Sequence, residues 1–184
     1  GVKKIFSSDD IRAKLLEKNT FLSSANSINW GRLAPQIVYY VSAYCDLIAE
    51  GEIKYGELLD VTVPTGNFGN ILAAYYARLL GAPIRKFICA SNVNDVLARF
   101  VKTGVYDPGE SFTVTNSPSM DIRKSSNVER LLWILNDGDS AEVARLTEEA
   151  NGALSAFSDT AFLEDLALAL GVSRQTVISL EKGK

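Results

Sequence analysis

The sequence predicts an α/β fold, part of a doubly wound domain with parallel strands, flanking helices and a helical carboxyl end. Two apolar runs, residues 58–63 and 84–90, are rich in branched side chains, which is typical of parallel strands buried on both faces. A tight turn and a helix over residues 69–80, closed by Gly81 and Pro83, lie between the two runs. Strand, helix and strand in this order form a βαβ unit.

Two helices and a short strand are expected before this unit. Asp9 begins a short amphipathic helix, and Thr20 begins a short strand that runs into a polar turn. Residues 30–51 then carry apolar side chains on most faces of a helix, which Gly51 ends. We expect this second helix to lie buried against the sheet.

Mostly helical structure is expected after the second strand. One helix covers residues 92–104, from an asparagine cap to a glycine, and residues 111–115 suit a third short strand. Two more helices are expected at residues 128–136 and 140–151. The carboxyl end then continues as two short helices.

The composition is that of a globular chain. With 184 residues, of which 47% are hydrophobic and 22% charged, the chain is long enough for one hydrophobic core. Its net charge of -3 provides no overall positive field for nucleic acid or an anionic membrane. No apolar run reaches the ~20 residues that cross a bilayer, and the amino end has no signal-peptide pattern. We expect a soluble, cytoplasmic protein that binds no membrane and whose overall charge does not favour nucleic acid.

The cysteine and histidine content excludes several chemistries. Cys45 and Cys89 fall within an expected helix and an expected strand, where apolar packing is favoured over a disulfide or a metal ligand. A reducing compartment is therefore expected. The chain contains no histidine, which excludes a Ser-His-Asp triad, a Cys-His pair and most zinc sites. No metal site is predicted.

The turn after the first strand has the composition of an anion site. We call residues 65–70 the glycine loop; its members are Thr65, Gly66, Asn67, Phe68, Gly69 and Asn70. The two glycines permit backbone angles closed to other residues and a close approach to a ligand, and the next helix directs its positive dipole end at the same place. A plain tight turn is the alternative, but the three polar donors Thr65, Asn67 and Asn70 favour a phosphate site.

Four sequence blocks in this order carry a family resemblance. They read "NSINWGRLAPQIVYY" from Asn26, "VPTGNFGN" from Val63, "ASNVNDVLARF" from Ala90 and "SPSMDIRKSSNVERLLW" from Ser117. Together they resemble threonine synthase, in the branch found in many bacteria and fungi. The resemblance implies a fold type II lyase that uses pyridoxal 5'-phosphate to convert O-phosphohomoserine and water to L-threonine and phosphate. It also implies that the glycine loop holds the cofactor phosphate.

The chain departs from this family in its lysines. The family binds its cofactor through a lysine in a Phe-Lys-Asp context, and no Lys-Asp pair occurs here. The interior lysines suit a solvated surface: Lys54, Lys86, Lys102 and Lys124. The hydroxyl partner for the cofactor's pyridine nitrogen also has no counterpart. We therefore expect a central fragment without catalytic residues, inactive alone, whose partners are the missing segments of the same enzyme. Exposed sheet edges would favour self-association.

Polar residues before the second helix are candidates for substrate binding. Asn26, Ser27, Asn29 and Arg32 offer amide and guanidinium donors to a substrate phosphate or carboxylate. An equally good interpretation is an asparagine cap on the next helix with a solvated Arg32. Farther along the chain, helix capping is favoured over ligand contact for Asn92 and Asn94.

The last residues present a separate pattern. We divide the chain into an α/β segment carrying the glycine loop, residues 1–150, and a helical tail, residues 151–184. Residues 162–184 resemble the helix-turn-helix of small bacterial repressors, with contact-forming residue types at Ser173, Arg174, Gln175 and Thr176. The usual supporting helices are missing, so a helical hairpin is favoured over a DNA-binding or interaction module joined to an enzyme-like body.

Overall fold

A βαβ unit forms the centre of the molecule. The computed structural model describes residues 5–23, 29–103, 106–109 and 113–151. Strand β1 (Leu59–Pro64) pairs in parallel with β2 (Ile84–Ala90), and helix α5 (Gly69–Leu79) connects them. The register places Val63 opposite Cys89. The α/β class and the parallel pair predicted from the apolar runs are therefore confirmed.

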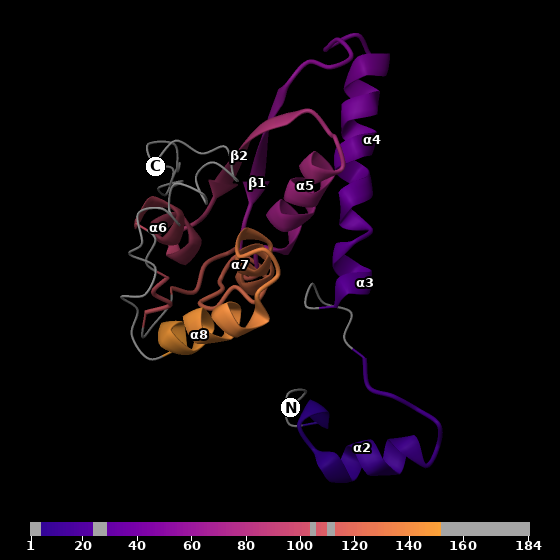
Figure 1. The fold of residues 1–184 in the computed structure, drawn as a ribbon, viewed down its shortest axis with the longest axis vertical. Coiled ribbons are helices and arrows are strands. Elements are labelled where there is room, and N and C mark those ends of the chain that lie inside the picture. The colour runs from indigo at the N-terminus through magenta and orange to yellow at the C-terminus, as the bar shows by residue number, and fades with distance from the viewer. Residues whose placement is uncertain (1–4, 24–28, 104–105, 110–112, 152–184) are drawn as a thin grey trace.

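Helices surround this unit (Figure 1). Helices α3 (Trp30–Leu33) and α4 (Gln36–Ala49) run beside α5, on the side away from the strands. Helix α6 (Val96–Thr103) contacts β2, and α7 (Val128–Leu135) packs with α8 (Ser140–Asn151).

One helix stands apart from the others. Helix α2 (Asp9–Leu16) buries none of its residues and lies away from the rest of the fold in Figure 1. Helices α3 and α4 contact α5, α6 contacts β2, and α8 contacts α7.

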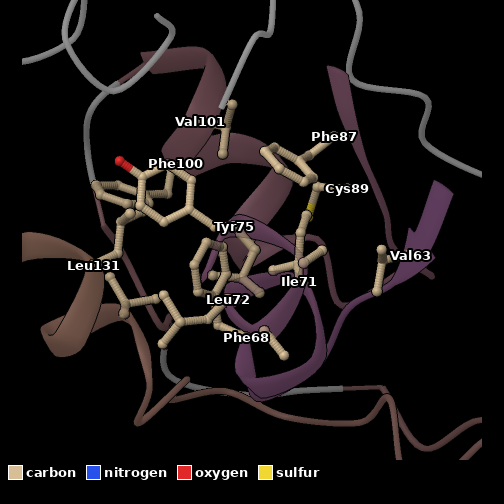
Figure 2. Packing of buried hydrophobic residues seen from close by; sticks show 14 of the residues in the cluster. Val63, Phe68, Ile71, Leu72, Tyr75, Phe87, Cys89, Phe100, Val101 and Leu131 are labelled. Carbon is tan, nitrogen blue, oxygen red and sulfur yellow. The ribbon is translucent and has the colours of Figure 1, made fainter. Parts of the chain in front are cut away.

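The hydrophobic core is built on α5. Its side chains Ile71 and Leu72 are buried, and Phe68, directly before the helix, is buried with them. Figure 2 shows these residues beside Phe87 of β2 and Leu131 of α7. Burial of such side chains supplies about 1.5–3 kcal/mol each. The core therefore holds the start of α5 between the sheet and α7.

Four expected elements differ in the structure. The helix expected to begin at an asparagine cap at Asn92 begins at Val96. The helix expected over residues 30–51 is divided into α3 and α4 at Ala34 and Pro35. Pro35 has no N–H to continue a helix, and it precedes α4 instead. No strand forms over residues 20–23 or 113–115, the described parts of the two other expected strands. Within the described residues, β1 pairs with β2, and neither of these segments joins them.

The burial pattern also differs from the expected one. On α4 the side chains of Val38 and Val41 are exposed, as is Cys45, and the expectation of a buried helix is wrong. Only Val63 of β1 is buried, since α5 is the main helix that contacts β1 among the described residues. Cys89 is buried as expected, and burial raises the pKa of its thiol to about 11. This thiol stays protonated at neutral pH and packs as an apolar group.

Several expectations fall on residues outside those described. They include Asn26, Ser27, the tail over residues 152–184 and its helix-turn-helix pattern. In the described part of the chain, no helix is long and apolar enough to cross a membrane. The same part contains no cluster of side chains suited to a metal ion.

Candidate anion site at the start of helix α5

The glycine loop is anchored where both strands end. The backbone N–H of Thr65 donates to the Ala90 carbonyl at 2.8 Å, which ties the loop to the carboxyl end of β2. The Thr65 hydroxyl donates to the Val63 carbonyl at 2.7 Å and is buried. The Thr65 hydroxyl therefore stabilises the turn. The sequence had suggested instead that this hydroxyl donates to a ligand.

The left-handed residue of the loop is Phe68. Its φ of 62° and ψ of -1° are those of the left-handed region, and its ring is buried in the core. Neither Gly66 nor Gly69 has a positive φ, so the expectation that the glycines provide unusual backbone angles is wrong. The buried ring holds this conformation, which otherwise costs about 1–2 kcal/mol for a residue with a Cβ.

Gly66 is required for a close approach instead. A Cβ atom at this position would lie 2.9 Å from the Ser119 carbonyl oxygen and 3.1 Å from Cδ1 of Ile122. The polar segment around Ser119 therefore packs directly on the backbone of the glycine loop. The glycines were expected to let a ligand approach the main chain closely. At Gly66 the group that approaches is the Ser119 carbonyl of the same chain.

The loop presents unpaired backbone donors. Among the described residues, none accepts a hydrogen bond from the N–H groups of Gly66, Phe68, Gly69 or Asn70. Three of these groups belong to the first turn of α5 or directly precede it, and no side chain caps this end. Such N–H groups, with the positive end of the helix dipole, favour an anion.

These donors border a cavity of about 610 Å³. Residues of the glycine loop form one wall of the cavity. Another part of the lining comes from Arg32 of α3 and Gln36 of α4. A further part comes from the polar segment, residues 117–121, through Ser117, Ser119 and Met120. A cavity of this size accommodates a phosphorylated cofactor-sized molecule.

Asn70 connects the loop to α4. The Tyr40 hydroxyl donates to Oδ1 of Asn70 and, at 3.2 Å, to its backbone carbonyl. Burial raises the pKa of the Tyr40 phenol, so the phenol keeps its proton and remains a donor at neutral pH. Because the Asn70 oxygen is occupied, its amide nitrogen is the side-chain group suited to an anion.

The residues before α4 were expected either to cap a helix or to contact a ligand, and the structure places Asn29 and Arg32 differently. Asn29 caps α3, since its Oδ1 accepts from the Gly31 N–H at 2.9 Å. Arg32 lines the cavity, and its carbonyl accepts from Nε2 of Gln36 at 2.9 Å. Arg32 is thus an exposed residue at the border of the same cavity as the loop donors.

A carboxylate that the sequence did not single out holds the segment from Ser117 to Asp121, which packs on the glycine loop. Asp121 accepts at one oxygen from Nδ2 of Asn92 at 3.0 Å and from Nδ2 of Asn94 at 2.9 Å. It also accepts from the Thr115 N–H at 2.7 Å and the Thr115 hydroxyl at 2.8 Å. Asn92 and Asn94 use these side-chain amides to bind Asp121. The residues that line the cavity from Ser117 to Met120 are thereby tied to the end of β2.

We expect Asp121→Asn to lower the melting temperature at neutral pH. Hydrogen bonds, first from the Thr115 N–H, lower the pKa of Asp121. A lowered carboxyl pKa stabilises the fold above the ordinary value of about 3.9, and this contribution is lost as the pH falls through the lowered pKa. Thermal unfolding from pH 7 to pH 3 should therefore show a gap between the parent protein and the variant that narrows in acid.

Asp46→Asn on exposed α4 is the matched control for this change. It removes the same charge without removing these hydrogen bonds. If it lowered the melting temperature as much as Asp121→Asn, or if the gap stayed constant down to pH 3, the stabilising role of Asp121 would be contradicted.

Comparisons with known proteins agree on one family. No family model matches the chain. It is 56% identical over 148 residues to human threonine synthase-like 1, a match that covers 79% of the chain and 20% of that protein. It is 46% identical over 127 residues to threonine synthase from Methylobacillus glycogenes, which covers 68% of the chain and 26% of that protein.

A solved structure shares the fold. The crystal structure of threonine synthase from Brucella melitensis, with bound pyridoxal phosphate, superposes with a TM-score of 0.77 at 37% identity. The match covers 91% of this chain and 34% of that one. The chain thus spans between a fifth and about a third of the length of the proteins that it matches. Given these identities and the shared fold type II α/β architecture, the chain belongs to the threonine synthase family.

Proposed function

We propose that this chain supplies the cofactor phosphate site of a lyase that converts O-phosphohomoserine and water to L-threonine and phosphate. The observation that carries the proposal is the set of unpaired N–H groups at the start of α5, which border the cavity. Membership in the threonine synthase family supports the same assignment.

The described residues fit the phosphate of pyridoxal 5'-phosphate. The N–H groups of Gly66, Phe68 and Gly69, with the amide of Asn70, would hold this phosphate, each through a charge-assisted hydrogen bond of about 1.5–3 kcal/mol. Thr65 and Asn67 are the remaining polar members of the loop. When bound, the cofactor supplies an electron sink for the substrate carbon atoms.

The substrate brings a second phosphate and a carboxylate to the same cavity. Arg32 is the cationic side chain among the residues that line it, and a guanidinium binds either group through paired N–H donors. Gln36 lies one helical turn away and can orient the substrate by a further hydrogen bond. Asn26, Ser27 and Asn29 complete the proposed set of substrate contacts.

Proton transfer and covalent attachment of the cofactor require groups from outside the described residues. Lys54 and Lys124 are exposed, Lys86 lies half-buried on β2, and none of the three lines the cavity. We therefore include further segments of the same enzyme among the partners of this chain. Their contribution would be a lysine at the cavity and a partner for the cofactor ring.

Titration with inorganic phosphate, pyridoxal phosphate and pyridoxal tests the proposal. We expect the first two ligands to shift the NMR amide signals of Gly66, Phe68, Gly69 and Asn70. Pyridoxal, which has the ring but no phosphate, is the matched control and should leave these signals in place. Equal shifts with pyridoxal, or no shift of the loop amides with either phosphorylated ligand, would contradict the proposed site.

A further inference from the structure

Three consecutive residues just before α7, residues 125–127, hold the glycine loop through hydrogen bonds. The Ser126 N–H and hydroxyl both donate to Oδ1 of Asn67, each at 2.8 Å. Nδ2 of Asn127 donates to the Asn67 carbonyl at 3.0 Å, and the Ser125 hydroxyl donates to the Gly66 carbonyl. These bonds all place donors of one segment on oxygen atoms of two successive loop residues.

This arrangement fixes the direction of two peptide groups. All peptide bonds of the described residues are trans, so the carbonyl and the N–H of each peptide point in opposite directions. The carbonyls of Gly66 and Asn67 point toward residues 125–127. The N–H groups of Asn67 and Phe68, which belong to the same two peptides, must then point away from that segment. The Phe68 N–H is among the loop donors that no described residue engages.

The supporting segment is itself anchored in the core. Ser125 is buried, and its N–H donates to the Tyr106 hydroxyl at 2.6 Å. Asn127 is fully buried, and its Oδ1 accepts from a guanidinium nitrogen of Arg130 one turn into α7. The following residues Val128 and Leu131 belong to the hydrophobic core. Residues 125–127 are thus held in position by contacts within the protein itself.

We infer that Ser125, Ser126 and Asn127 are positioning residues, which hold the glycine loop with its N–H groups directed toward the cavity before a ligand arrives. Whether this ordering of the loop raises its affinity for a ligand rests on the proposed function of the loop as a phosphate site. A preformed cluster of donors binds an anion more tightly than a flexible one, because less conformational entropy is lost on binding.

The test uses the double variant Ser125→Ala with Ser126→Ala in the 184-residue chain. It removes two hydroxyl donors without changing charge, whereas Thr147→Val on α8 removes a hydroxyl that donates to Val143 and is the matched control. Backbone 15N relaxation of residues 66–69 is measured without ligand, and inorganic phosphate is then titrated. We expect the double variant to loosen these amides. Because a looser loop loses more conformational entropy on binding, we also expect phosphate binding to weaken about tenfold.

A conservative variant and two separate readouts make the result decisive. Ser126→Thr retains a hydroxyl donor and should keep the loop ordered. Unchanged relaxation of residues 66–69 in the double variant, or loosening of equal size in Thr147→Val, would overturn the positioning role. A third outcome is that the loop loosens in the double variant but the parent protein binds no phosphate. This result would support the positioning role and overturn the proposed function.

Discussion

Replacing Gly66 with valine is expected to abolish phosphate binding at the start of α5. The Cβ atom alone would lie 2.9 Å from the Ser119 carbonyl oxygen, closer than such atoms approach in folded proteins, and valine adds two methyl groups. The polar segment that lines the cavity would have to move, at a cost of about 1–3 kcal/mol for overpacking. Calorimetric titration with inorganic phosphate and a thermal unfolding curve measure the two effects.

Two alanine variants separate close approach from backbone strain. Gly66→Ala adds the colliding Cβ atom at a φ that suits any residue, whereas Gly56 has a φ of 84° with no atom within 4 Å of a Cβ. We expect Gly66→Ala to lose phosphate binding, and Gly56→Ala to lose only about 1–2 kcal/mol of stability. If Gly66→Val bound phosphate like the parent protein, the close packing of Ser119 on the loop would not be needed for the site.

With pyridoxal phosphate and O-phosphohomoserine, we expect the chain alone to produce threonine at background level. The described lysines do not line the cavity, so none is placed to bond to a cofactor whose phosphate lies in the glycine loop. Enzymes gain several orders of magnitude in rate from positioning a reacting group, and a surface lysine lacks this advantage. Absorbance titration, borohydride reduction and peptide mapping measure any specific lysine adduct.

Addition of the remaining segments of a threonine synthase in trans is the positive control. These segments contain the family's cofactor lysine, and activity should appear only when they are present. Stoichiometric labelling of Lys54, Lys86, Lys102 or Lys124 together with turnover by the chain alone would contradict this expectation. Labelling at low stoichiometry spread over several lysines is what solvated side chains should give.

Local sequence patterns determined the centre of the fold. The apolar run over residues 84–90 coincides with β2, and the helix expected from Gly69 begins at that residue. Strand and helix signals of this kind depend on nearby side chains, and glycine or proline marks their ends. The same patterns failed where burial depends on distant layers, as on β1 and α4, whose outer faces are exposed.

The sequence also located the glycine loop, because its polar residues and its family resemblance lie within one short stretch. Only the tertiary structure showed which residues hold the loop and pack against it. The hydrogen bonds from Ser125 and Ser126 join residues 59 positions apart, and the collision that excludes a side chain at Gly66 comes from Ser119. Contacts of this range depend on how α7 packs against α5, and local residue preferences carry no information about that packing.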